Sequence, residues 1–420
     1  MLNKNNEREL AYVVMINNIT PIPGYDRVEL AHVGGWTVVV GKGEFKAGDP
    51  AVYFEIDSQL PEVKPFTDME FLAKKHYKVK TQKMCKSISQ GLLMSAENFG
   101  WTPIYNVDGM ADIVAIKDSC GEYHYNGAHW YADDESRFLT KQLGITYAIP
   151  EDNSRKANTP NKHMRMAQRH KKLFSHQPFK WLMKKDWGRK LLFLFFGKKN
   201  DKKSDWPHWV KKTDEERIEN LPYLFEDKSP WIATEKIDGT STTFTLKRGK
   251  GLKKDEFYIC SRNVVFNKLD KDCFYNTNVY IEMAEKYDIY NKMHTLLYDH
   301  FTDCDWITIQ GETYGQGIQK RDYHMTEHNF MAFNFITSKE GKFNSERMKV
   351  LLERTFGIPC VPILNENYIL PDTLDELREY VDSDTSVIDG DIREGIVFRS
   401  LDGTRSFKCV SPTYLMKYHQ

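Results

Sequence analysis

The feature that most constrains the fold of this 420-residue chain is a series of short, strand-like stretches that begins at Trp231. Seven stretches rich in apolar and β-branched residues have the length of strands: 231–237, 241–247, 256–261, 306–311, 330–336, 394–399 and 405–410. Three longer stretches have apolar residues at helical spacing: about 277–299, 345–355 and 373–382. This mixture predicts an α+β domain built on antiparallel strands.

The N-terminal part of the chain carries a different pattern, in which short strands alternate with turn residues from residue 8 to about 110. Four stretches follow this pattern: 12–16, 36–40, 52–56 and 77–81. Strands of this length and spacing predict a small all-β barrel. We therefore expect a barrel domain over 1–150, a linker or insertion over 151–211, and a mixed domain over 212–420.

The expected linker is strongly basic. Residues 155–212 contain 18 Lys and Arg and three acids, a local charge of about +15, although the formal net charge of the chain is zero. Two interpretations stay open, namely a positive footprint for a phosphate backbone and a solvated linker. Directly after it, Thr213-Asp214-Glu215-Glu216 has the form of a capping box and predicts a helix that ends near Leu221.

Cysteine usage and hydropathy indicate the cellular compartment in which the chain is expected to fold. The seven cysteines include no C-x-x-C pair, and their odd number and low density disfavour a disulfide framework. The N-terminus is polar, and the longest apolar run, 191–196, is too short to span a bilayer. We expect a cytoplasmic, reducing environment, no membrane association and no evident protein partner.

The sharpest local signal is Glu235-Lys236-Ile237-Asp238-Gly239-Thr240. On an extended strand Lys236 and Asp238 point to the same face. An isolated K-x-D-G pattern arises by chance, and its alternative interpretation is a surface lysine at a strand edge. Five charged or aromatic blocks follow it in order and favour the chemical interpretation: 260–263 (CSRN), 311–320 (GETYGQGIQK), 330–335 (FMAFNF), 394–399 (EGIVFR) and 406–408 (SFK).

This ordered set resembles the nucleotidyl motifs of the covalent nucleotidyltransferase superfamily, which contains ATP-dependent ligases and mRNA capping enzymes. Within it the chain is most similar to ATP-dependent RNA ligases. The stretches 35–40, 42–45, 48–49, 56–58 and 60–61, together with Tyr53, are similar to the OB domain of RNA ligase family 5. The resemblance implies an N-terminal OB-like β-barrel followed by an antiparallel-sheet nucleotidyltransferase (ATP-grasp-like ligase) domain.

The resemblance assigns Lys236 as the amine that takes AMP from ATP. A free lysine has a pKa of about 10.4, so desolvation, a neighbouring cation or a metal must help it lose its proton. Lys408 would be that cation and would contact the transferred phosphate. Asp238 and Glu394 would hold hydrated Mg2+ or Mn2+, and Glu312 would engage the ribose or the metal's water shell. The alternative for these acids is ordinary surface carboxylates.

Six residues are assigned to the nucleotide by this resemblance: Glu235, Ile237, Phe333, Arg262, Arg217 and Lys320. Glu235 would accept a hydrogen bond from the adenine amino group, and Phe333 would stack on the ring unless it belongs to the core. Arg262 would position a phosphate or the RNA end. Arg217 and Lys320 would contact the pyrophosphate leaving group, with surface roles as the alternative. The lysine often found two positions before Lys408 is Ser406 here, which leaves a second cation at that motif in doubt.

The resemblance implies an ATP-dependent RNA ligase that joins a 5′-phosphate to a 3′-hydroxyl through lysyl-AMP and RNA-adenylate intermediates, in RNA repair. Its partners would be RNA or RNA-containing duplex ends. The alternatives are a DNA nick ligase, a capping-type nucleotidyltransferase, and a nucleic-acid-binding protein with a decayed site. In the barrel, Trp36, Tyr53, Lys42 and Lys46 are candidates for contacting nucleic acid, with core or surface roles as the alternative. The natural substrate, the role of 151–211 and the oligomeric state stay open.

Overall fold

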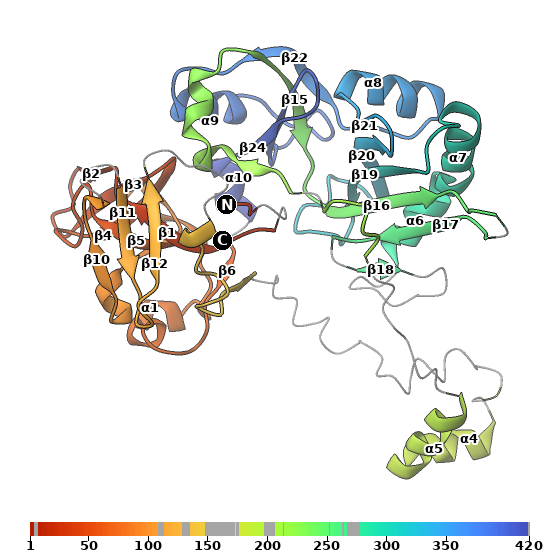
Figure 1. The fold of residues 1–420 in the computed structure, drawn as a ribbon, viewed down its shortest axis with the longest axis horizontal. Helices are drawn as coiled ribbons and strands as arrows, with labels where there is room; N and C mark the ends of the chain where they lie inside the picture. Colours follow the sequence, from red (N-terminus) through yellow and green to blue (C-terminus); the bar gives the residue numbers. More distant parts are fainter. Residues whose placement is uncertain are drawn as a thin grey trace. The chain divides into compact units, whose positions relative to one another are not determined.

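The computed structural model describes residues 1–3, 7–107, 113–127, 135–147, 173, 176–196, 206–212, 214–251, 253–262, 264–266 and 278–418 (Figure 1). The chain forms two compact units. The first unit contains Met1–Ile149, Lys211–Ser241 and Thr308–Gln420, and the second contains Pro150–Val210 and Thr242–Ile307. The expected barrel and all five expected catalytic residues (Lys236, Asp238, Glu312, Glu394 and Lys408) therefore belong to the same unit.

The N-terminal barrel is built from short strands in small sheets (Figure 1). Its strands are β1 (Ala11–Met15), β2 (Asn18–Pro21), β3 (Val28–Val33), β4 (Trp36–Gly41), β5 (Pro50–Phe54), β6 (Ser58–Gln59), β7 (Thr81–Met84), β8 (Ser87–Gln90), β9 (Leu92–Ser95), β10 (Thr102–Ile104), β11 (Ile113–Lys117), β12 (Tyr123–Gly127) and β13 (Thr146–Tyr147). Its helical turns are η1 (Phe66–Asp68), α1 (Glu70–Ala73), η2 (Ala96–Phe99) and η4 (Glu135–Arg137). The sheet orders are β1-β5-β9, β2-β3-β4, β10-β11-β12, β7-β8 and β13-β6.

Three of the four predicted N-terminal strands are confirmed as β1, β4 and β5. The fourth prediction, 77–81, is wrong, because His76 and Tyr77 both have a positive φ, 51° and 56°, which interrupts an extended chain. The strand begins only at Thr81. Alternating apolar and basic residues therefore mark a turn followed by a strand at this point.

The barrel core lies on both faces of β1 and β5. Tyr12 and Tyr53 pack with Trp36 in one cluster, and Val13 and Phe54 contribute to a second cluster on the other face. Successive side chains of a strand point to opposite faces, so this arrangement explains why both strands are apolar at nearly every position.

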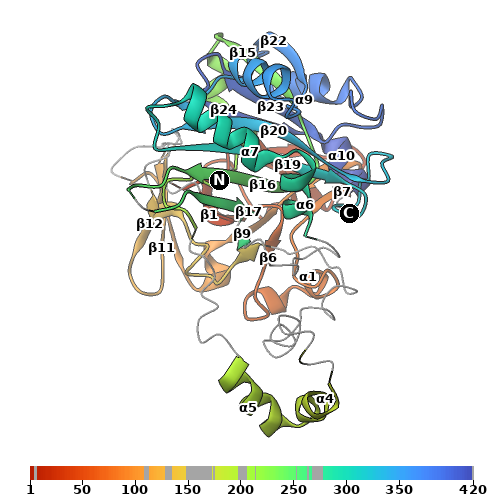
Figure 2. The ribbon, with the colours of Figure 1, turned by 90° about the vertical axis from the view of Figure 1, so that its right-hand side faces the viewer.

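The mixed domain contains a five-stranded sheet in the order β14-β24-β23-β15-β22. Its strands are β14 (Glu216–Arg217), β15 (Pro230–Lys236), β22 (Ile363–Ile369), β23 (Gly395–Ser400) and β24 (Ser406–Val410). The pairs are antiparallel except β14 with β24. Helix α9 (Leu374–Asp382) begins with a capping box between Thr373 and Glu376 and packs against β23 and β24 (Figure 2). Its residues help to bury Trp231, Phe398 and Phe407.

Further elements complete the first unit. They are η5 (Ile218–Asn220), η6 (Pro222–Glu226), β19 (Trp306–Gly315), β20 (His328–Thr337), β21 (Gly341–Lys342), α8 (Ser345–Lys349), η8 (Val350–Thr355) and α10 (Pro412–Tyr418). Strands β19, β20 and β21 are neighbours in one sheet. Phe330 and Phe335 of β20 are fully buried and belong to the core of this domain.

The second unit contains β16 (Thr240–Lys247), β17 (Glu256–Cys260) and β18 (Val265–Phe266), paired antiparallel in that order. Helices α6 (Val279–Lys286) and α7 (Ile289–Thr295) and turn η7 (Leu296–His300) follow. The predicted helix 277–299 is therefore interrupted, because Asp288 adopts a positive φ of 50°. The basic segment forms α4 (Gln177–Lys184) and α5 (Asp186–Phe196), and none of the described helices is long and apolar enough to cross a membrane.

The helix predicted after the apparent capping box is wrong. Thr213 lies outside the described residues, and the following residues form β14 and the short turn η5. Glu216 and Arg217 pair in parallel with Phe407 and Lys408 of β24. The Glu216 side chain accepts hydrogen bonds from the amide of Leu2 and the side chain of Asn220, so it does not cap a helix.

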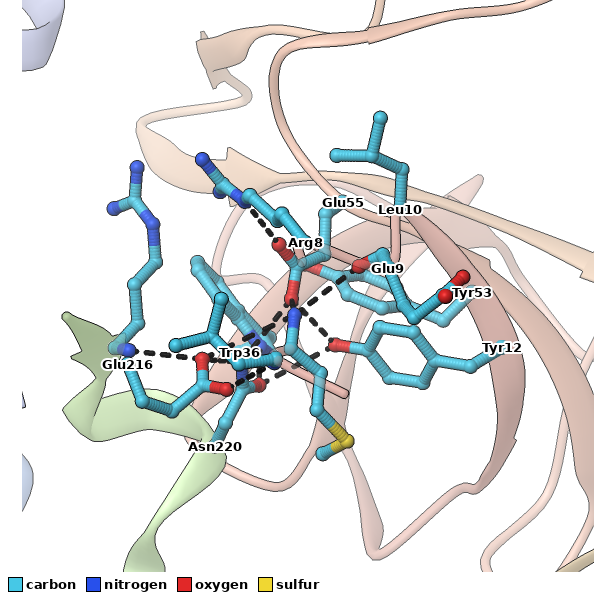
Figure 3. A network of polar contacts seen from close by, with 12 residues as sticks. Arg8, Glu9, Leu10, Tyr12, Trp36, Tyr53, Glu55, Glu216 and Asn220 are labelled. Atoms are coloured by element: carbon cyan, nitrogen blue, oxygen red, sulfur yellow. Dashed lines mark hydrogen bonds and ion pairs between the residues drawn. The ribbon is translucent and has the colours of Figure 1, made fainter. Parts of the chain in front are cut away.

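A buried polar network joins the barrel to the segment around β14 (Figure 3). Glu55 is fully buried and its carboxylate accepts from the Met1 amine, from Tyr12 Oη at 3.0 Å, and from Arg8 Nε at 3.0 Å. Asn220 also donates to Glu55, at 3.1 Å. The positive partners outweigh the cost of burial and hold the pKa of Glu55 well below its usual range.

Asn220 and Gly35 make the second half of this junction. The Trp36 indole donates to Asn220 Oδ1 at 2.7 Å, and the amide of Gly35 donates to the carbonyl of Glu219 at 2.8 Å. A Cβ on Gly35 would lie 2.6 Å from the Cα of Glu219, so only glycine allows this approach. The barrel is thus fixed to the residues that precede β15.

We predict that Glu55→Gln lowers the free energy of unfolding by roughly 3–5 kcal/mol, because it leaves buried cations without a counter-charge. Urea denaturation followed by tryptophan fluorescence measures the change. Glu62→Gln is the matched control, since Glu62 is exposed on the same domain. An equal effect of both substitutions would contradict the role assigned to Glu55.

The same pair of proteins provides a pH test. The folded-state pKa of Glu55 is lowered, so its stabilising contribution is present above the unfolded pKa of about 4.3 and is lost as the pH falls toward the folded value. The difference in stability between wild type and Glu55→Gln should therefore be constant near neutral pH and shrink below about pH 4.3.

Candidate active site

Lys236 and Glu394 meet across two neighbouring strands. Lys236 is the last residue of β15, and in the antiparallel register it lies opposite Gly395, the first residue of β23. Its Nζ lies 2.6 Å from Glu394 Oε1. The Glu394 side chain is 11% exposed and that of Lys236 is 24% exposed, so the pair lies where β15 ends and β23 begins, with the lysine side chain partly exposed.

Asp238 lies in the loop directly after Lys236 and is buried. Its Oδ2 accepts a hydrogen bond from the Tyr414 hydroxyl, and its amide donates to the Tyr323 hydroxyl at 2.7 Å. The next residue, Gly239, passes so close to β19 that a Cβ would lie 2.3 Å from the carbonyl oxygen of Thr313. This close approach brings Glu312 beside the lysine loop.

The charges of this cluster perturb one another. Burial lowers the pKa of Lys236, but the carboxylates of Glu394, Glu312 and Asp238 outweigh burial and hold it above its ordinary value. Burial, followed by repulsion from Glu394, raises the pKa of Asp238 to about 7. The cluster thus favours the protonated forms of both Lys236 and Asp238 relative to the free side chains.

These acids fit a divalent cation. Glu394 Oε2 is buried and has no hydrogen-bond partner among the described residues, and its negative charge keeps Asp238 partly protonated. Oxygen ligands from carboxylates suit Mg2+ and Mn2+. A cation bound by Asp238 and Glu394 would satisfy the open oxygen and remove the repulsion. After Glu394, Glu312 is the acid that raises the pKa of Lys236 most strongly.

Another group of acids lies in the barrel. Among the described residues, Asp118, Glu122 and His124 are the group whose ligand atoms lie within 4.8 Å of one another, whereas the trio of Asp238, Glu312 and Glu394 does not meet that limit. Asp118 is already engaged there by His124 at 3.2 Å, by Gln142 at 2.6 Å and by two backbone amides. These hydrogen bonds stabilise a turn around Asp118, and they account for the closeness of the three side chains without a metal.

Lys408 of β24 faces an acid that the sequence did not predict as a partner. Its Nζ donates to Asp214 Oδ1 at 2.6 Å, and both side chains are about nine-tenths buried. Burial lowers the pKa of Lys408, and the positive charges of Arg8, Arg217 and Lys236 lower it further against the opposing effect of Asp214. Lys408 thus lies within electrostatic range of three further cations, and its ammonium group is paired with the carboxylate of Asp214.

The residues expected to bind adenine lie together in part. Ile237 and Phe333 belong to one apolar cluster with Tyr314 and Val361. Glu235 is buried, and its carboxylate accepts from the Ser386 hydroxyl at 2.5 Å and from the Val387 amide at 3.0 Å. The structure therefore ties Glu235 to the loop before β23.

The three expected basic residues differ in placement. Arg217 is buried, with its guanidinium 5.6 Å from the Trp36 ring, and its Nε and Nη1 have no hydrogen-bond partner within the described part of the chain. Lys320 is exposed in the loop after β19, and Arg262 is half-buried in the second unit, between β17 and β18. The open nitrogens of Arg217 make it the best placed of the three for an anion.

The four barrel residues that were candidates for contacting nucleic acid also differ in burial. Trp36 and Tyr53 are buried in the barrel core, so they cannot stack on a base, and their core interpretation is confirmed. Lys42 and Lys46 are exposed. Ser406, which stands where a second lysine is often found, donates to Glu215 instead.

Four residues of the site were missed from the sequence: Asp214, Arg321, Tyr323 and Tyr414. Asp214 and Tyr414 meet residues 194 and 176 positions away in the chain, and such pairs leave no periodic signal. The position of Tyr414, six residues after Lys408 and at the start of a helical stretch, was the one clue available.

Comparison with known proteins adds family matches for the two parts of the chain. Residues 229–419 match the family model described as RNA ligase, and residues 10–96 match a model described as an OB-fold domain. No curated protein matches the chain. The predicted order, an OB domain followed by a ligase domain, is confirmed.

Solved structures of an RNA ligase from Naegleria gruberi are similar over almost the whole chain. The structure with PPi is 24% identical with a TM-score of 0.68, over 98% of this chain and 99% of that chain. A variant of that ligase with AMP and Mn is 24% identical with a TM-score of 0.67, and a variant with ATP and Mn is 23% identical with a TM-score of 0.66, both at the same coverage. This likeness confirms the predicted α+β fold class.

We predict that Mn2+ binds roughly ten times more tightly at pH 8 than at pH 6, because binding requires the ionised form of Asp238. Its pKa of about 7 lies between these values. Calorimetric titration of wild type and Asp238→Asn at both pH values isolates this site from other acids. An Asp238-dependent affinity that does not change with pH would contradict the raised pKa of that carboxyl.

Proposed function

We propose that this chain, with its RNA ligase domain preceded by an OB-fold domain, is an ATP-dependent RNA ligase that joins a 5′-phosphate to a 3′-hydroxyl. The observation that carries the proposal is the position of one amine, Lys236, 2.6 Å from Glu394 and beside Asp238, with Lys408 in electrostatic range. This is the set of groups that covalent transfer of a nucleotide to a lysine requires. RNA repair is the setting we propose for it.

In the first step Lys236 Nζ attacks the α-phosphorus of ATP. A nitrogen–phosphorus bond forms as the bond between the α-phosphorus and the bridging oxygen breaks, and the electron pair leaves with pyrophosphate. Lys236 must first lose the proton that its three acidic neighbours now hold in place. A divalent cation at Asp238 and Glu394 would supply positive charge that offsets those acids and the developing phosphate charge.

Other side chains bind and orient the nucleotide. Ile237 and Phe333, which share an apolar cluster, would bracket the adenine ring, and Glu235, two residues before Ile237 in the chain, would meet its amino group. Lys408 would exchange the carboxylate of Asp214 for a phosphate oxygen. Arg217, with two buried nitrogens that lack partners among the described residues, would meet the leaving pyrophosphate.

The later steps pass AMP to the RNA 5′-phosphate and then release AMP when the 3′-hydroxyl attacks. The partners we propose are RNA or RNA-containing duplex ends, contacted by the OB-like domain over 1–150 and by the basic segment 151–211, with the ligase domain over 212–420. The low density of cysteines supports a cytoplasmic, reducing compartment. Arg262 and Lys320 are the further candidates for phosphate contacts.

We predict that purified protein incubated with radiolabelled ATP and Mg2+ gives a labelled protein band, and that Lys236→Ala abolishes the label. Lys236→Arg is the control for folding, since it keeps a cation beside Glu394 and cannot form the adduct. Lys228→Ala, which removes a surface lysine paired with Asp372, should label like wild type. Equal labelling of Lys236→Ala and wild type would refute the assignment of the nucleophile.

A panel of nicked duplexes separates the ligase from its rivals. With ATP, we expect sealing of nicks whose 3′-hydroxyl strand is RNA, and at least tenfold slower sealing when that strand is DNA. GTP in place of ATP should give less than a tenth of the lysyl adduct. Preference for DNA ends would favour a nick ligase for DNA, and preference for GTP would favour a capping-type enzyme.

A further inference from the structure

The two acids beside Lys236 are supported by three side chains from two separate segments, the loop between β19 and β20 and helix α10, which the proposed mechanism does not use. Asp238 is held by two tyrosines: Tyr414 of α10 donates its hydroxyl to Oδ2, and Tyr323, between β19 and β20, accepts from the Asp238 amide at 2.7 Å. Both tyrosines are buried, at 0% and 2% exposure. The side chain and the backbone of Asp238 are therefore fixed separately.

Arg321 connects this pair to Glu394. The guanidinium forms a two-point ion pair with Asp389, Nη2–Oδ1 at 2.5 Å and Nε–Oδ2 at 3.2 Å, and donates from Nη1 to the carbonyl of Ile392 at 2.6 Å. Ile392 lies two residues before Glu394 in the chain. Arg321 is 3% exposed, so a planar, buried fork fixes the backbone that leads into β23.

The same guanidinium also faces the tyrosines. Its central carbon lies 4.1 Å from the centroid of the Tyr323 ring and 5.9 Å from that of Tyr414. One buried cation therefore contacts the support of Asp238 on one side and the support of Glu394 on the other.

Two buried carboxylates that repel each other need such support. Both carboxylates are largely buried, and without fixed partners two like charges would turn their side chains away from each other. A metal site gains affinity when the groups around its ligands hold them at the binding separation, and loss of one such group typically costs 10–100-fold in affinity.

We propose that Arg321, Tyr323 and Tyr414 are positioning residues that hold Asp238 and Glu394 at the separation at which they bind a divalent cation. The inference rests on the proposed function for the identity of the site. It extends that function to residues that touch neither the nucleotide nor the reacting atoms. It assigns the hydroxyl of Tyr414, rather than its ring, as the group that matters.

The test is the Tyr414→Phe variant, which removes one oxygen and keeps the buried ring. Binding of Mn2+ is measured by electron paramagnetic resonance of the free ion, with Asp238→Asn defining the signal that belongs to this site. We expect Tyr414→Phe to bind Mn2+ about tenfold more weakly. The Mn2+ concentration for half-maximal adenylylation of Lys236 should rise by the same factor, while the rate at saturating Mn2+ returns to near the wild-type value.

Tyr418→Phe is the matched control. Tyr418 lies on the same helix, its ring centroid lies 4.7 Å from that of Tyr414, and its hydroxyl donates to the carboxylate of Asp391 at 2.9 Å and not to Asp238. It loses a hydrogen bond of the same kind and should bind Mn2+ like wild type. If it weakens Mn2+ binding as much as Tyr414→Phe does, a general loosening of α10 is the cause and the proposal is overturned.

Two further results decide the matter. Wild-type Mn2+ affinity in a folded Tyr414→Phe protein overturns the proposal. If that variant does not fold, Tyr323→Phe is tested in its place by the same criterion, because it removes the hydroxyl that accepts from the Asp238 amide. Failure of the proposed function has a different signature, since wild-type protein would then bind Mn2+ through Asp238 and form no lysyl-AMP. The Mn2+ measurement would still decide the role of the tyrosines.

Discussion

The structure depends on placing one amine among buried carboxylates. Lys236 and Glu394 form an ion pair at 2.6 Å, and the acids around the amine hold its proton more firmly than water would. The proposed attack of Lys236 on the α-phosphorus of ATP requires that this proton be lost. The proposed chemistry of the lysine is therefore linked to the binding of a cation and a nucleotide beside these acids.

The fold supplies this placement through strand register. Because β15 pairs with β23 and β23 with β24, Lys236 lies opposite Gly395, and Lys408 lies two strands away in the same sheet. The parallel pairing of β14 with β24 adds Arg217 beside Lys408. The barrel fixes β14 in turn through Glu55 and Asn220 (Figure 3). The barrel thereby helps to hold β14, and with it Arg217, beside Lys408.

Sequence alone predicted what depends on local pattern. The strands that carry Lys236, Phe333 and Lys408 followed from alternation and composition, and the resemblance named the acids. It did not predict contacts that depend on packing, such as those of Asp214 with Lys408 or Tyr414 with Asp238. The apparent capping box at Glu216 misled because parallel pairing with β24 and the bond to Asn220 stabilise an extended chain there. Trp36 and Tyr53 had the composition of a stacking surface, but both faces of β5 are buried.

Mass-spectrometric peptide mapping after incubation with ATP and Mg2+ tests the central claim most directly, because it locates the covalent bond itself. The account predicts one added AMP on the peptide that contains Lys236, lost on acid treatment as expected for a nitrogen–phosphorus bond. An adduct on any other residue, or intact protein with no adduct despite bound ATP and metal, would contradict it.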